Sequence, residues 1–160
     1  VVAQTVQAES SHPEWTSFAC VLISAEVFKK IGLLDEKYFM YFEDVNFCAR
    51  ARNSGFRIVN VPESHVVHLR GGSSPVKSNT KLRKRLPKYF YESRTRYFYG
   101  QYGHLGLFAA NILWLMGWGI ALARSAIFPS FERTDCEKQW LDIWTNFDFP
   151  RRPFIHPENY

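Results

Sequence analysis

Cysteine is scarce in this sequence, and its placement excludes two common uses of that residue. The three cysteines, Cys20, Cys48 and Cys136, are odd in number and far apart, and none belongs to a Cys-x-x-Cys pair. This arrangement argues against a disulfide framework and against a zinc site, and it is typical of a reducing compartment. An initiator methionine, a signal-peptide pattern and internal repeats are also missing, so we expect a partial chain that forms one domain or part of one.

Acidic residues are nearly absent from residues 77–101, where eight basic side chains stand against the single Glu92. The resulting net charge of +7 exceeds the +5 of the whole chain. Such a run is most often a solvated face, but it also fits nucleic acid, lipid headgroups or a phosphate-bearing substrate. Residues 105–123 follow without a charged side chain, and their number is at the lower end of what spans a bilayer. We therefore expect a membrane surface as a partner, and no nucleic acid.

In the first half of the chain, short apolar runs alternate with segments of helical periodicity. The predicted strands cover residues 18–23, 56–61 and 65–69. The predicted helices cover residues 25–31, which Ser24 can cap, and residues 43–54, and each is followed by a glycine, Gly32 or Gly55. Alternation of strand and helix indicates an α/β layer architecture.

The sequence changes character after Pro75. Residues 79–101 have helical potential that Pro87 interrupts or restarts, and a further helix is predicted near residues 136–144. Between them, residues 105–123 contain only one strongly polar side chain, Asn111. This stretch fits a membrane span, a re-entrant or interfacial helix, or a buried helix that packs on the core.

The most informative stretch is residues 33–74, with the sequence LLDEKYFMYFEDVNFCARARNSGFRIVNVPESHVVHLRGGSS. It contains eight features in a fixed order: an Asp-Glu pair, an aromatic run, a Glu-Asp pair, an arginine-rich helix, a Gly-aromatic-Arg strand, a proline, a Val-x-His and a Gly/Ser loop. In this order they closely resemble the acceptor-side half of family 2 glycosyltransferases, particularly the bacterial rhamnosyltransferase-like members. The resemblance covers about residues 15–103. It is specific for the family and poorly specific for the sugar.

The resemblance implies a partial GT-A fold, which is an α/β fold, with C-terminal membrane-associated helices. Residues 1–76 would form the acceptor-side part of the catalytic domain, and residues 77–103 a basic aromatic helical segment. Residues 104–128 would form the membrane-associated helix, and residues 129–160 a tail. The implied reaction is an inverting transfer from a nucleotide-sugar donor to a lipid-linked or polysaccharide acceptor in cell-envelope glycan synthesis. The charge pattern places it at the cytoplasmic face of the cell membrane.

By resemblance to the family's Glu-Asp motif, Asp44 is the candidate base that takes the proton of the acceptor hydroxyl, with Glu43 beside it. Both would lie in the first turn of a helix, where the dipole favours the ionised carboxylate. Acids at a helix start also serve as plain capping charges, and that interpretation stays open here.

The family's metal ligands are only partly represented. His68 matches a histidine that binds the metal in a number of members, and His65, on the same face of the predicted strand, is the rival ligand. The expected cofactor is Mg²⁺ or Mn²⁺, which an Asp-x-Asp would complete. The 160 residues contain no Asp-x-Asp, a further reason to expect a partial chain.

The remaining assignments by resemblance concern substrate contacts. The residues assigned to substrate binding are Asp35 and Glu36 at the acceptor mouth, Arg50, the loop residues Gly72, Ser73 and Ser74, and Arg94 for a lipid diphosphate. Two residues depart from the family pattern: Asn46 replaces a second aspartate, and Phe18 replaces a small glycine. The alternative function is a catalytically inactive membrane-docking or binding module, which the lack of an Asp-x-Asp upstream of Val1 in the parent gene would favour.

Overall fold

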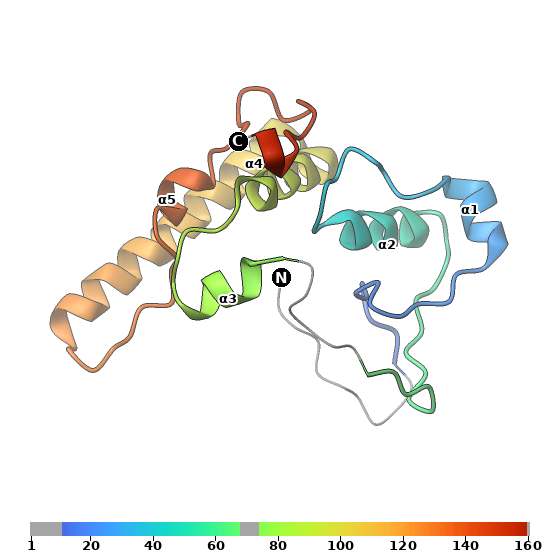
Figure 1. Cartoon of the computed structure of the whole chain (residues 1–160), viewed down its shortest axis with the longest axis horizontal. Coiled ribbons are helices and arrows are strands. Elements are labelled where there is room, and N and C mark those ends of the chain that lie inside the picture. The colour runs from blue at the N-terminus through green and yellow to red at the C-terminus, as the bar shows by residue number, and fades with distance from the viewer. Residues whose placement is uncertain (1–10, 68–73, 160) are drawn as a thin grey trace. The chain divides into compact units, whose positions relative to one another are not determined.

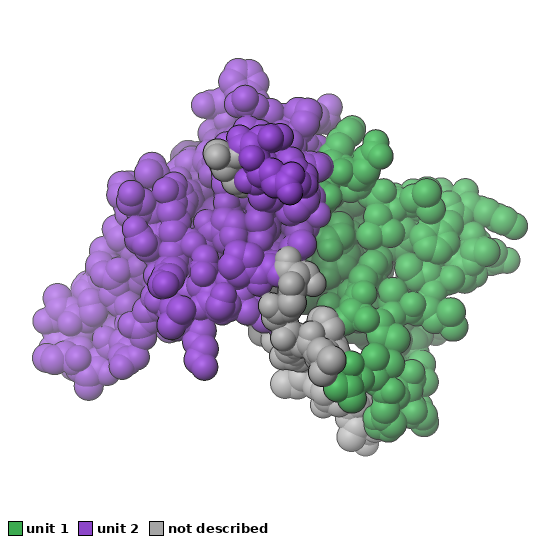
Figure 2. All heavy atoms as spheres, in the orientation of Figure 1, with its two compact units in different colours: residues 1–38, 42–70 green, residues 39–41, 71–160 purple. Residues whose placement is uncertain are grey.

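The computed structural model describes residues 11–67 and 74–159, and Figure 1 traces their path. The chain divides into two compact units (Figure 2). Unit 1 comprises residues 1–38 and 42–70, and unit 2 comprises residues 39–41 and 71–160. The aromatic run at residues 38–42 therefore passes from unit 1 into unit 2 for three residues and then returns.

Among its described residues, unit 1 contains the helices α1 (Ala25–Ile31) and α2 (Glu43–Asn53). The Ser24 hydroxyl accepts a hydrogen bond from the backbone N–H of Glu26 at 3.3 Å, and Gly32 follows α1 with φ of 76°. These features confirm the predicted first helix with its bounds. The second predicted helix is also confirmed, although α2 ends one residue earlier than expected.

The two helices of unit 1 share a small apolar core. Val27 of α1 is buried together with Phe47 and Ala51 of α2. The rings of Phe18 and Phe28 each lie with their centroids 5.6 Å from that of Phe47. This packing fixes the middle of α2, so that its first turn belongs to a well-anchored helix.

The strands predicted for residues 18–23 and 56–61 are wrong. A strand is stabilised by hydrogen bonds to a neighbouring strand, and in the described residues the pairing is limited to one antiparallel bridge between Ser11 and Asn60. The apolar side chain of Leu22 is fully exposed in the first of these runs. Residues 65–67 also form no strand, and residues 68 and 69 lie outside the described part. The regular structure that is described is helical, so the α/β class stays a prediction.

Unit 2 contains α3 (Val76–Lys81), α4 (Lys88–Ile127), α5 (Gln139–Asp142) and a short 3₁₀ helix at Pro157–Asn159. Pro87 immediately precedes α4, which confirms that the helical pattern restarts there. The buried core lies between these helices and consists of Val76, Leu86, Tyr89, Tyr91, Cys136 and Ile143. Figure 1 shows α5 beside the middle of α4, in agreement with the contacts between the two helices.

The long helix α4 is broken at Gly103, whose φ of 66° and ψ of −171° are not helical. The guanidinium of Arg94 donates a hydrogen bond to the Asn111 side chain at 2.7 Å. In an unbroken helix these two residues would stand about 25 Å apart along the axis. The chain therefore turns sharply at Gly103 and brings the second half of α4 back against the first.

The second half of α4 has one packed side and one bare side. Leu107 and Asn111 are fully buried, whereas Leu105, Leu113, Met116 and other apolar side chains are more than half exposed. By length and composition alone, α4 could cross a membrane, and 11% of its most apolar window is buried. Asn111 is not exposed on the bare side, because its amide also donates to the carbonyl of Ile143 at 3.1 Å.

Candidate functional site

The candidate catalytic carboxylates stand at the start of α2, directly after a strained turn. Tyr41 and Phe42 have φ angles of 70° and 66°, so two consecutive aromatic residues adopt the left-handed conformation. Such a backbone costs about 1–3 kcal/mol per residue and persists only where surrounding contacts impose it, often at functional sites. Glu43 and Asp44 follow in the first helical turn.

Asp44 is a partly buried carboxylate that the backbone holds in place. One of its oxygens accepts a hydrogen bond from the N–H of Val45 at 2.8 Å, and it interacts with the backbone N–H of Phe18. Burial raises the pKa of Asp44 above its ordinary value, and these backbone N–H groups oppose the rise. A raised pKa makes a carboxylate a stronger acceptor for a proton, as a general base requires.

Glu43 is the second carboxylate of the pair. Burial is the main cause that raises its pKa, and the neighbouring charge of Asp44 raises it further. Its Oε2 atom is buried and has no hydrogen-bond partner among the described residues. A buried carboxyl oxygen without a partner is uncommon, and it leaves Glu43 able to bond a ligand.

The other candidates of unit 1 lie in the turns and contacts around α2. The Asp35 side chain accepts a hydrogen bond from the backbone N–H of Lys37 at 3.0 Å, which closes a tight turn. Glu36 in the same turn is exposed. The Arg50 guanidinium donates to the carbonyls of Ile31 and Leu33, and thereby ties α2 to the end of α1. Its substrate role stays a prediction.

The candidates of the Gly/Ser loop are only partly described. Ser74 is described in unit 2, where its hydroxyl bonds the Tyr89 hydroxyl at 2.8 Å and accepts from the N–H of Val76. Gly72, Ser73 and His68 lie outside the described residues. In the part that is described, no three His, Cys, Asp or Glu side chains come together as a metal site would need. His68, the predicted ligand, is not among these residues, so its role in binding a metal stays a prediction.

Arg94 lies on the first half of α4 in unit 2. Its guanidinium bonds Asn111, stacks over the Phe98 ring at 4.9 Å, and has no carboxylate partner among the described residues. Burial lowers the pKa of Arg94 to about 10, and the arginine therefore stays charged at neutral pH. Nearby, the buried Tyr91 hydroxyl has no hydrogen-bond partner in the described structure. A charge held this way suits an anion, in keeping with the predicted diphosphate contact.

Sequence reasoning missed two features of this region. It recognised the aromatic run but not the left-handed backbone at Tyr41 and Phe42, because no local signal in the sequence favours positive φ at aromatic residues. It also gave no role to Ser93, which contacts that run from α4.

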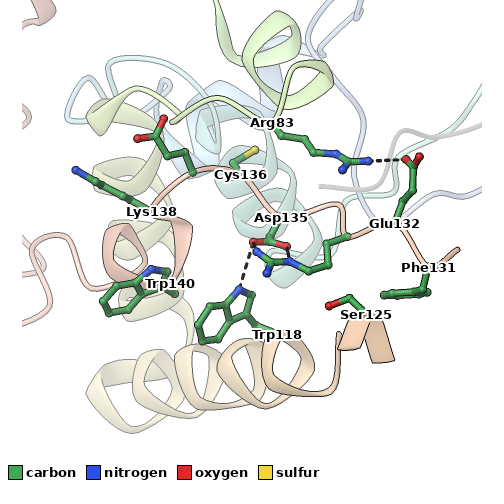
Figure 3. Close-up of a pocket in the computed structure, with 11 residues that line it drawn as sticks. Arg83, Trp118, Ser125, Phe131, Glu132, Asp135, Cys136, Lys138 and Trp140 are labelled. Carbon is green, nitrogen blue, oxygen red and sulfur yellow. Dashed lines mark hydrogen bonds and ion pairs between the residues drawn. The ribbon is translucent and has the colours of Figure 1, made fainter. Parts of the chain in front are cut away.

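A separate open cavity of about 590 Å³ lies within unit 2 (Figure 3). Trp118 and Ser125 of α4 belong to its lining, together with residues 131–133 and 135–138. The Arg133 guanidinium donates two hydrogen bonds, of 2.7 and 2.8 Å, to the Asp135 carboxylate, and the Trp118 indole N–H donates to the same carboxylate at 3.2 Å. None of the predicted site residues lines this cavity. The partly buried Asp135 carboxylate already has its hydrogen-bond donors within the protein, so this part of the lining has a structural role.

Comparisons with known proteins connect the first half of the chain to a family. The family model for "Glycosyltransferase like family 2" matches residues 4–87, just over half of the chain. The N-acetylglucosaminyl-diphospho-decaprenol L-rhamnosyltransferase of Mycobacterium tuberculosis is 38% identical over 60 residues, 38% of this chain and 20% of that protein.

Further relatives match stretches of similar length. The low-salt glycan biosynthesis hexosyltransferase Agl10 of Haloferax volcanii is 43% identical over 49 residues, 31% of this chain and 15% of that protein. Rhamnosyltransferase WbbL of Escherichia coli is 33% identical over 55 residues, 34% of this chain and 21% of that protein. The chain thus spans 15–21% of the length of these relatives. No solved structure matches it with significance.

Proposed function

The chain belongs to glycosyltransferase family 2, and from this membership we propose that it is the acceptor-side part of an inverting sugar transferase with a GT-A fold. The donor is a nucleotide sugar, and the acceptor is a lipid-linked or polysaccharide glycan of the cell envelope. The relatives support this class, because their names describe rhamnosyl and hexosyl transfer and, in one case, a decaprenol-linked acceptor. In this proposal, residues 1–76 supply the acceptor side of the catalytic domain.

The carboxylate pair at the start of α2 carries the proposal. Asp44 accepts the proton of the acceptor hydroxyl, and the freed oxygen attacks the anomeric carbon of the donor sugar. The bond from that carbon to the nucleoside diphosphate breaks on the opposite face, which inverts the configuration. The raised pKa of Asp44 supports the role, because a carboxylate that holds a proton more tightly is a better base.

The other charged groups have supporting roles in this proposal. Glu43, with its free buried oxygen, bonds the acceptor and keeps it aligned with Asp44. Arg94, with Ser74 and the rest of the Gly/Ser loop, binds phosphate oxygens of the lipid-linked acceptor or the donor. Mg²⁺ or Mn²⁺ is the proposed cofactor, with His68 as one ligand.

The experiment that tests the proposed function is Asp44→Asn in the full-length protein. Loss of a general base lowers turnover by about 10²–10⁴-fold, while donor binding and the fold stay nearly intact because the amide keeps the shape of the side chain. Turnover of a nucleotide sugar and donor affinity are measured in parallel. Glu26→Gln, which changes an exposed acid of α1 outside the proposed site, is the control and retains full turnover. Near-normal turnover in Asp44→Asn would rule out Asp44 as the base.

A further inference from the structure

The three residues that enter unit 2 just before α2 are held by the first turns of α4. The Ser93 hydroxyl donates a hydrogen bond to the backbone carbonyl of Met40 at 2.9 Å. Ser93 is 3% exposed, so the contact is shielded from water. A buried carbonyl that loses its donor has no solvent to replace it.

Aromatic contacts from the same helix complete this hold. The Tyr41 ring lies parallel to that of Tyr89, with centroids 6.5 Å apart and planes 4° apart, and edge-on to Phe90 at 5.6 Å. The Phe39 ring meets Tyr89 edge-on at 5.2 Å. All of these residues belong to unit 2. We call this set of contacts the α4 clamp: residues 39–41 against Tyr89, Phe90 and Ser93.

The clamp is connected to the candidate base through the backbone. Tyr41 is its last residue, and the peptide bond to Phe42 leads back into unit 1 and to Glu43. Tyr41 and Phe42 are the two residues with left-handed backbone. Because an aromatic residue seldom keeps that conformation unless contacts impose it, the clamp stabilises the left-handed backbone of Tyr41, two residues before α2.

We propose that Ser93 is a positioning residue for Asp44, acting through Met40 and the strained turn at Tyr41 and Phe42. The inference rests on the proposed transfer reaction and assigns it a residue of α4. Ser93 touches neither donor nor acceptor in this account. It holds the backbone of residues 39–41, directly before Phe42 and α2, in one conformation, and a misplacement of about 1 Å in a catalytic group can reduce turnover as much as 10²-fold.

The test compares Ser93→Ala with Thr95→Val in the full-length protein. Thr95 is a matched control, because it is buried on the same helix and its hydroxyl donates to a remote carbonyl, that of Thr145, at 2.8 Å. Both variants lose a buried hydrogen bond, but only Ser93→Ala loses one that holds the peptide leading to α2. Amide hydrogen exchange of residues 39–47 and steady-state kinetics are measured for each.

The expected result is faster exchange in residues 39–47 and a kcat about 10-fold lower in Ser93→Ala, with the donor KM within twofold of the parent protein. In Thr95→Val, the exchange of this segment and the kcat stay within twofold of the parent. Unchanged exchange in Ser93→Ala would overturn the clamp, and faster exchange with normal kcat would overturn its role in positioning. A parent protein without any transfer would instead overturn the proposed function, and with it the inference.

Discussion

Glu43 and Asp44 are adjacent carboxylates whose ionised forms are both disfavoured by burial. Burial of a carboxylate destabilises the folded protein, and an uncharged polar side chain at the same position would make the fold more stable. Such carboxylates are therefore found mostly at functional sites. Because the pKa values of both carboxyl groups are raised by folding, the stability of the folded protein should depend on pH, and this dependence can be measured.

Glu43→Gln is expected to raise the melting temperature by a few degrees at pH 7.5. The pKa of Glu43 is raised above its ordinary value of 4.5 in the folded state. The free energy of unfolding therefore falls as the pH rises from that ordinary value through the raised one, because ionised Glu43 is disfavoured in the folded protein. Below about pH 4 the carboxyl is protonated in both states, and the advantage of glutamine disappears. Thermal denaturation at the two pH values measures the difference.

Glu36→Gln serves as the control for this measurement, since Glu36 is exposed and its substitution should leave the melting temperature unchanged at both pH values. An equal gain for Glu43→Gln at pH 7.5 and at pH 4 would show that ionisation of Glu43 is not the cause.

At single positions, the sequence predicted what local chemistry decides. Ser24 and Gly32 mark the ends of α1 through a hydroxyl cap and a positive φ, and both signals act over a few residues. Tyr41 and Phe42 could not be predicted in this way, because their left-handed backbone opposes the local preference, and the contacts that hold Tyr41 come from α4, about 50 residues away.

At the level of elements, α4 and residues 131–138 show how a charged segment is stabilised on an apolar helix. Asp135 is 14% exposed, accepts two hydrogen bonds from Arg133, and accepts a third from Trp118 of α4. The hydrogen bond from Arg133 is the main cause of the lowered pKa of Asp135. This carboxylate fastens residues 131–138, here called the return segment, to α4.

Asp135→Asn is expected to destabilise the protein by about 1–2 kcal/mol at pH 7, because the amide cannot accept from both Arg133 and Trp118 as a carboxylate does. The pKa of Asp135 is lowered on folding, so its contribution is present above its ordinary value of 3.8 and is lost as the pH falls through the lowered value. Urea unfolding at pH 7 and at pH 3 measures both effects.

Glu132→Gln is the matched control, because Glu132 forms an ion pair with Arg83 at 2.7 Å but is 81% exposed. Its removal should change the free energy of unfolding by less than about 0.5 kcal/mol. If the two variants behaved alike, Asp135 would not be the fastening point.

The elements also show where sequence patterns stop being informative. Helices form within one segment, and α1, α2 and the start of α4 after Pro87 could all be predicted from caps and periodicity. A strand needs a partner, and the apolar runs at residues 18–23 and 56–61 have none beyond the bridge at Asn60 in the described residues. The break at Gly103 was not predicted either, because an isolated glycine is often tolerated within a helix.

At the scale of the whole molecule, the bare side of α4 bears on where the protein resides. The apolar side chains exposed along its second half are Leu105, Phe108, Leu113, Met116, Ile120 and Ile127. The opposite side packs on the return segment, with Trp118 bonded to Asp135. If residues 105–127 crossed a bilayer, the paired charges of Arg133 and Asp135 would enter the hydrocarbon with them, at considerable cost. We therefore predict that α4 lies in the plane of a membrane surface and does not cross the bilayer.

Membrane fractionation of the full-length protein tests this arrangement. We expect the protein in the membrane fraction, retained through a high-salt wash because apolar contact dominates, and released by alkaline carbonate because no helix spans. Met116→Glu on the bare side should shift most of the protein to the soluble fraction, since it places a charge where lipid contact is expected. Phe149→Glu, at a position 73% exposed but outside α4, should leave the distribution unchanged. Resistance to carbonate would mean that α4 spans the membrane after all, and a fully soluble parent protein would mean that its bare side meets another protein surface.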